Sequence, residues 1–94
     1  MHDETALTLD DTPARARNLE IRSAGSEQLV QNSATGQIHV LNALAGLILE
    51  RCDGATALER IVDEIVTTKD VDRAAAARDV LNVCADFRAK GLIG

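Results

Sequence analysis

The side chains that could do chemistry in this chain are two histidines, two cysteines and several carboxylates. His39 lies in a short apolar run and could serve as a general base if a Ser or Cys nucleophile lay beside it. No Ser or Cys can be paired with His39 on sequence grounds, and no carboxylate is placed to orient its ring. We therefore interpret His39 as a surface or satisfied strand residue and predict that the protein is not an enzyme.

The two cysteines, Cys52 and Cys84, do not form a metal-binding pattern. The chain has no CxxC pair, and neither His2 nor His39 lies near a cysteine in the sequence. A structural zinc site needs about four ligands at close spacing. We expect no metal and no other cofactor. Two buried free thiols are the favoured interpretation, and a disulfide between them stays open.

Three carboxylates, those of Glu59, Asp63 and Glu64, lie in one predicted helix. Helical spacing puts them mostly opposite the apolar residues of that helix, so we interpret them as a solvent-facing surface. Catalytic carboxylates would need a pocket, for which a domain of this length has little room.

The composition indicates one small acidic domain with an aliphatic core. The 94 residues carry a net charge of −5 and are 46% hydrophobic, and Phe87 is the only aromatic residue. An acidic chain without a basic run is a poor ligand for nucleic-acid phosphates or anionic lipid. The first residues lack a signal-peptide core, and no window reaches transmembrane length. We expect a cytoplasmic protein that binds neither nucleic acid nor membrane.

The order of the elements predicts an α+β fold, a small winged-helix-like domain with an N-terminal three-stranded antiparallel β-sheet followed by three α-helices. Residues 1–17 are polar and are expected to form a flexible arm before a domain at 18–94. Strands are expected at 19–22, 27–32 and 37–41, with a hairpin loop at 33–36. In the third strand, Ile38 and Val40 share one face and His39 takes the other.

Each predicted helix begins with a capping signal. Asn42 and Asp72 fit the N-caps of the first and third helices. Thr56 fits the second, in a capping box with Glu59. Gly54 suits the C′ position of the first helix, where left-handed geometry is needed.

The predicted helices are amphipathic, and the chain end is expected to return to the core. Gly91 ends the third helix, and Leu92 and Ile93 should fold back. The expected buried stripes are Leu44, Leu47, Ile48 and Cys52, then Leu58, Ile61, Val62 and Ile65, then Ala76, Val80, Val83, Cys84 and Phe87.

Four short segments, taken in order, resemble the PqqD family. They are Asn42-Ala43-Leu44-Ala45, Leu49-Glu50-Arg51-Cys52-Asp53-Gly54, Ile61-Val62 and Lys90-Gly91-Leu92-Ile93. The likeness covers roughly residues 19–94. It implies a RiPP recognition element, which binds the leader segment of a ribosomally made precursor peptide and presents it to a modifying enzyme. The implied partners are that precursor and a maturation enzyme, such as a radical SAM enzyme or a leader peptidase.

The resemblance also implies a binding site. In the family the leader adds as a strand to the edge of the third β-strand and packs against the third helix. Main-chain bonds then give affinity, and side-chain pockets give specificity. Carried over to this chain, the edge residues are Gln37, Ile38, His39, Val40 and Leu41, and the facing helix positions are Arg78, Asn82, Val83, Asp86 and Phe87.

The pathway and the assembly state stay open. The hairpin Ala34-Thr35-Gly36 replaces the Pro-Glu-Gly that is common in PqqD itself, and Trp and Tyr are absent. The precursor could therefore belong to pyrroloquinoline quinone, to a lasso peptide or to another pathway. The alternative function is a winged-helix DNA-binding regulator, although the third helix mixes Arg and Asp rather than forming a basic face. A free strand edge could also pair with a second copy to form a homodimer.

Overall fold

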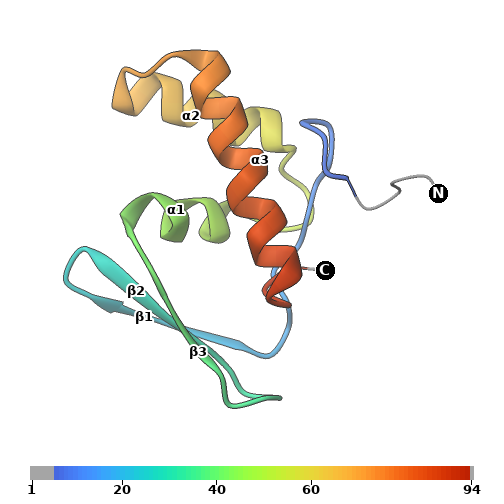
Figure 1. Cartoon of the computed structure of the whole chain (residues 1–94), viewed down its shortest axis with the longest axis vertical. Coiled ribbons are helices and arrows are strands. Elements are labelled where there is room, and N and C mark those ends of the chain that lie inside the picture. The colour runs from blue at the N-terminus through green and yellow to red at the C-terminus, as the bar shows by residue number, and fades with distance from the viewer. Residues whose placement is uncertain (1–5, 94) are drawn as a thin grey trace.

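The described part of the chain folds as a three-stranded antiparallel sheet with three helices on one side of it (Figure 1). The computed structural model describes residues 6–93. The strands are β1 (Leu19–Ala24), β2 (Glu27–Asn32) and β3 (Ile38–Leu41), and the helices are α1 (Ala43–Arg51), α2 (Leu58–Lys69) and α3 (Arg73–Ala89). The predicted α+β class is confirmed.

The sheet is a meander in the order β1-β2-β3, built from two hairpins. Ala24 pairs with Glu27, so the first hairpin has a two-residue turn in which Gly25 has a φ of 67°. Such tight turns need a positive φ, which glycine adopts at no steric cost. β1 therefore runs two residues further than the predicted 19–22. β3 starts one residue later than predicted, because Gln37 lies outside the strand.

The two faces of the sheet have different surroundings. Val30 and Leu41 are buried beneath the helices, and His39 lies opposite Val30 on that covered face. Ile38 and Val40 share the other face, as predicted. That face points away from the helices, which leaves Ile38 61% and Val40 58% exposed.

Two of the predicted helix caps are confirmed. The Asn42 side chain accepts a hydrogen bond from the Ala45 N–H at 2.8 Å at the start of α1. The Asp72 carboxylate accepts one from the Ala75 N–H at 3.2 Å at the start of α3. Each bond spans three residues, so a local pattern is enough to find it.

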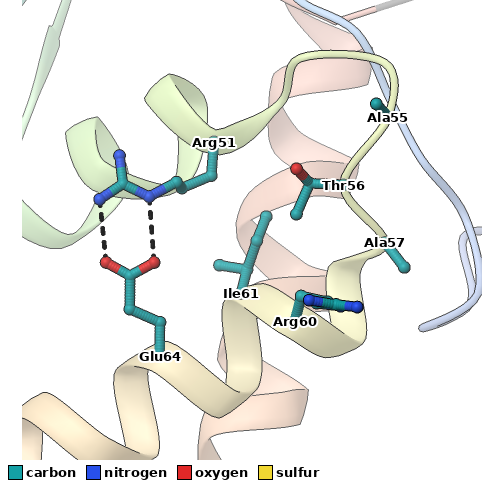
Figure 2. Close-up of a pocket in the computed structure, with 7 residues that line it drawn as sticks. All are labelled: Arg51, Ala55, Thr56, Ala57, Arg60, Ile61 and Glu64. Atoms are coloured by element: carbon teal, nitrogen blue, oxygen red, sulfur yellow. Dashed lines mark hydrogen bonds and ion pairs between the residues drawn. The ribbon is translucent and has the colours of Figure 1, made fainter.

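The predicted capping box of α2 is wrong. The N-cap is Ala57, which makes no side-chain cap bond. Thr56 lies in the turn between α1 and α2 (Figure 2), and its hydroxyl donates to the Asp53 carboxylate at 3.0 Å. Gly54 has the expected positive φ, at 83°, but follows the C-cap Cys52 by two residues, one position beyond the predicted C′.

The N-terminal segment takes over the capping of α2. The Asp11 carbonyl accepts from the Leu58 N–H at 3.0 Å, and the Leu9 carbonyl accepts from the Glu59 N–H at 2.9 Å. These carbonyls satisfy donors that a helix start leaves unpaired. Of the predicted flexible arm, residues 1–5 lie outside the described part. The described remainder bonds to the helices, and the flexibility of the arm and the boundary at residue 18 stay predictions.

Arg15 ties this segment to the end of α1. Its Nη1 donates to the carbonyls of Leu49 at 3.3 Å and Glu50 at 2.6 Å, at the helix end where the helix dipole favours a cation. We expect Arg15→Ala to lower the free energy of unfolding by about 1–2 kcal/mol. Urea denaturation would measure this change, with the exposed Arg17→Ala as a control near zero. An equal loss in both variants would contradict the assigned role.

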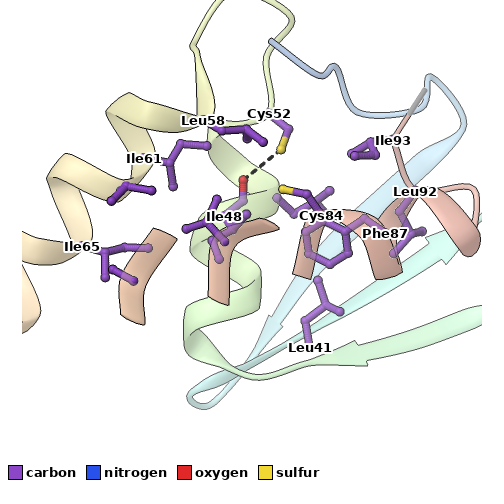
Figure 3. Close-up of a cluster of buried hydrophobic side chains, with 14 of the residues drawn as sticks. Leu41, Ile48, Cys52, Leu58, Ile61, Ile65, Cys84, Phe87, Leu92 and Ile93 are labelled. Atoms are coloured by element: carbon purple, nitrogen blue, oxygen red, sulfur yellow. Dashed lines mark hydrogen bonds between the residues drawn. The ribbon is translucent and has the colours of Figure 1, made fainter. Parts of the chain in front are cut away.

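The core is aliphatic around one aromatic ring, as the composition predicted (Figure 3). Leu92 and Ile93 fold back into it, as predicted. The expected stripes hold for α2, but Val83 of α3 and Leu44 and Leu47 of α1 are only half-buried. The buried apolar residues are Val30, Leu41, Ile48, Leu49, Cys52, Leu58, Ile61, Val62, Ile65, Ala76, Val80, Cys84, Phe87, Leu92 and Ile93.

The two cysteines are free thiols inside this core, which is the interpretation favoured from the sequence. The Cys52 thiol donates to the Ile48 carbonyl at 3.2 Å. A hydrogen bond with Cys52 and burial both raise the pKa of the Cys84 thiol. Because the thiolate is the reactive form, a buried thiol with a raised pKa is chemically inert.

Candidate functional site

The two edge strands of the sheet differ in how well they are protected against pairing with a strand of another chain. β1 carries the charged side chains of Glu20 and Arg22, whereas β3 has the sequence Ile-His-Val-Leu, without Lys, Arg, Asp, Glu or Pro. Charges and prolines are the usual means by which an edge strand avoids pairing with another chain. β3 is therefore the edge that is open to an added strand.

The outward main-chain groups of β3 belong to Ile38 and Val40. The Asn32 N–H bonds to the Gln37 carbonyl at 2.9 Å, which directs Gln37 toward β2. Because bonding direction alternates along an antiparallel strand, His39 also bonds toward β2. The N–H and C=O groups of Ile38 and Val40 then point to the free edge.

A groove with a volume of about 290 Å³ lies between this edge and α3. Leu41 and Phe87 are buried at its floor, and Val83 is a half-buried wall residue. Asp86 and Lys90 lie on its rim and form an ion pair at 2.9 Å. The groove therefore combines an apolar floor with a charged border. Its lining residues are Val40, Leu41, Asn42, Ala45, Asn82, Val83, Asp86, Phe87 and Lys90.

The structure brings six of the ten predicted site residues together around this groove, namely Val40, Leu41, Asn82, Val83, Asp86 and Phe87. The other four do not line it. Gln37 precedes β3, His39 lies beneath the helices, and Arg78 is an exposed residue of α3. Ile38 lies on the outer face of the sheet, where Val40, two positions closer to α1, is the one groove-lining residue.

Three groove residues were missed from the sequence. Lys90 follows Asp86 by four positions and Asn82 by eight, so helical spacing could have found it. Asn42 was recognised only as a helix cap. No local sequence pattern could have predicted Ala45 as a groove residue, since its place there depends on how α1 packs against α3.

His39 differs from the surface or satisfied residue that the sequence predicted. Its Nε2 atom is buried and has no hydrogen-bond partner among residues 6–93. Gln28, also on the covered face, has its amide against Gly46 of α1, where an added Cβ would lie 2.7 Å from the Gln28 Cδ. The side chains behind the β3 edge thus serve the packing of sheet on helix.

A larger hollow, of about 490 Å³, lies between the end of α1 and the start of α2 (Figure 2). Arg51 and Glu64 face each other across it with two hydrogen bonds, at 3.0 Å and 2.9 Å. This bidentate pair already uses the guanidinium. We interpret the hollow as the junction of two helices rather than as a ligand site.

Two carboxylates of this junction are held in their charged form. The Arg51 guanidinium lowers the pKa of Glu64, and the N–H groups of Ala55 and Thr56 lower the pKa of Asp53. Because the unfolded chain then binds more protons, these groups stabilise the fold at neutral pH, and their contribution is lost as pH falls through the lowered pKa values. We expect the Tm to fall between about pH 5 and pH 3.

The ion pair between Arg51 and Glu64 provides a control for this pH prediction. Glu64→Gln removes one titrating group, so the Tm should fall less over the same pH range. The Tm would be followed by circular dichroism. An equal fall in both proteins would show that Glu64 does not contribute.

Residues 6–93 contain no group of three or more His, Cys, Asp or Glu side chains that could hold a metal ion. Within the same residues, no helix has the length and apolar character needed to cross a membrane.

A family model and a curated relative both match most of this chain. The family described as Coenzyme PQQ synthesis protein D (PqqD) matches residues 27–93. A relative from Rhodopseudomonas palustris (strain BisB5), named PqqA binding protein, is 30% identical over 81 residues, which are 86% of this chain and 79% of the relative.

Two solved structures share the fold. One is lasso peptide synthetase B1 complexed with the leader peptide, with a TM-score of 0.79 and 16% identity over 88% of this chain and 98% of that chain. The other is TbiB1 in complex with the TbiA(beta) leader peptide, with a TM-score of 0.77 and 22% identity over 85% of this chain and 93% of that chain.

Proposed function

This chain belongs to the PqqD family, and from that membership we propose that it is a non-catalytic recognition element for a precursor peptide. It binds the leader segment of a ribosomally made precursor and presents that precursor to a modifying enzyme. The observation that carries the proposal is the uncharged free edge of β3 beside an apolar groove.

Binding proceeds by strand addition. The leader pairs with the outward N–H and C=O groups of Ile38 and Val40, and alternate side chains enter the groove between β3 and α3. Main-chain hydrogen bonds do not depend on the side chains of the leader, so the groove must discriminate between leader sequences. Val83 and Phe87 offer apolar contact there.

The charged residues at the rim of the groove add selectivity for the charges of the leader. Asp86 and Lys90 are about half exposed, so a charged leader side chain can compete for either partner of their ion pair. Charges at an interface rim set register and partner choice more than affinity. We therefore expect the rim to select among leaders.

The relatives support this proposal. The curated relative is named for binding PqqA, and both solved structures hold a leader peptide. The modifying partner in our proposal is a maturation enzyme, such as a radical SAM enzyme or a leader peptidase. The encounter takes place in the cytoplasm, where the precursor is made.

DNA binding is not favoured. Arg73 at the start of α3 pairs with Asp63, and Lys90 at its C-cap pairs with Asp86, so these cations are already engaged by carboxylates. The net charge of −5 adds a repulsion that phosphate binding would have to overcome.

The test is a fluorescence-polarisation titration against labelled peptides encoded beside the gene for this chain. We expect one leader to bind with a Kd in the micromolar range or tighter, and a scrambled version of it to bind at least tenfold more weakly. A duplex DNA is titrated in parallel at low salt. Binding of DNA without binding of any peptide would overturn the proposal.

A further inference from the structure

The outer face of the sheet, which points away from the helices, becomes more apolar toward the free edge. On this face β1 presents Glu20 and Arg22, β2 presents Leu29 at 36% exposure between the polar Glu27 and Gln31, and β3 presents Ile38 at 61% and Val40 at 58%. A sheet face in contact with water normally carries polar residues. Here the most exposed apolar side chains gather on β3, the edge strand beside the groove.

The same two residues carry the outward main-chain groups. A strand paired with β3 would place the residues opposite Ile38 and Val40 on the outer face, because directly paired residues share a face. Their Cβ atoms would lie about 4.5–5.5 Å apart. Leu29 is already the cross-strand partner of Val40, so an apolar peptide residue opposite Val40 would extend this row.

We propose that the protein contacts the side chains on both faces of the bound leader strand. Alternate residues enter the groove against α3, and the intervening residues are apolar and pack on an outer patch formed by Leu29, Ile38 and Val40. The inference rests on the proposed function and specifies its ligand class. The recognised segment is a short strand with apolar side chains at consecutive positions, rather than at every second position only.

A short strand fits this patch better than a folded partner does. Stable protein interfaces bury at least about 1,000 Å² in total, which three side chains on a narrow sheet do not supply. An added strand needs no such area from the patch, because its main-chain bonds and its groove contacts contribute as well.

The test replaces the patch without changing the edge. Ile38→Thr and Val40→Thr keep β-branched side chains and the same main-chain groups. With the labelled peptide that binds most tightly in the titration above, we expect the double variant to lose about tenfold in affinity. Ile21→Thr is the matched control. Ile21 is 37% exposed and lies on β1, on the face shared with Val30, so its replacement should change the Kd less than twofold.

A second readout separates recognition from folding. An alanine scan of the peptide is repeated on Ile38→Thr, which changes the outer patch alone, and on Val83→Ala, with circular dichroism confirming the fold of each. Peptide positions whose effect shrinks in Ile38→Thr should alternate with those whose effect shrinks in Val83→Ala.

The outcomes are distinguishable. Unchanged affinity in the Ile38→Thr, Val40→Thr double variant, together with a loss of affinity in Val83→Ala, would overturn the proposed contacts to both faces of the leader. Leader binding itself would stand. Failure of the wild-type protein to bind any peptide would overturn both proposals. A dimer that dissociates in the double variant without a change in peptide affinity would assign the patch to a second copy and overturn the inference.

Discussion

Val40→Pro is expected to weaken leader binding about 100-fold while leaving the sheet folded. The Val40 N–H points to the free edge, so proline removes a donor that the leader needs and places its ring where the leader backbone would lie. The β2–β3 hydrogen bonds do not use this N–H, and edge strands tolerate proline where the N–H faces outward. Fluorescence polarisation measures the affinity, and circular dichroism checks the fold.

The opposite edge of the sheet provides the matched control. The two-residue hairpin makes Ala24 and Glu27 a bonded pair, so the Ile21 N–H also points away from β2. Ile21→Pro therefore makes the same change on the other free edge and should keep wild-type affinity. Equal binding by Val40→Pro and wild type, or an equal loss in both variants, would show that β3 is not the edge the leader uses.

Phe87→Ala is expected to lower the free energy of unfolding by about 3–5 kcal/mol. Phe87 is 1% exposed, is the only aromatic ring of the chain, and packs among aliphatic side chains from the sheet, the helices and the C-terminal segment (Figure 3). Its removal leaves a cavity that the neighbours cannot fill. For a domain whose total stability is about 5–15 kcal/mol, this loss is severe. Urea denaturation at 25 °C would measure it.

Phe87→Leu keeps most of the apolar volume and should cost clearly less than the alanine variant. A loss below about 1 kcal/mol for Phe87→Ala would contradict the central place of the ring. Because Phe87 belongs to the core and to the groove floor, a loss of leader binding in this variant would not separate the two roles. Val83, which is half-buried in the groove wall, is the cleaner position for testing the groove.

Much of the fold could be predicted because its signals are local. The alternation in 19–22 and 27–32 and the apolar spacing in 58–65 depend on neighbours at most four residues away. The caps Asn42 and Asp72 bond to N–H groups three residues on. Such interactions form whatever the rest of the chain does, so the sequence alone predicts the three strands, the three helices and their order.

The candidate site was reached through the family resemblance and not through any residue pattern. β3 and α3 are more than 30 positions apart, so no local signal reports that Leu41 and Val83 line one groove. Six predicted residues do meet there, while Ile38 and His39 fall on opposite faces of the sheet and Arg78 faces solvent.

The sequence by itself therefore determined the elements, the aliphatic core and the uncharged third strand. The tertiary structure alone decided which face of the sheet the helices cover, and so left Ile38 and Val40 exposed. It also replaced the predicted Thr56 cap with the carbonyls of Leu9 and Asp11, which lie more than 40 positions before the N–H groups they accept from. The physical reason is the same in both cases: alternation and capping preferences act along the chain, whereas burial and hydrogen bonding act between whatever segments packing brings together.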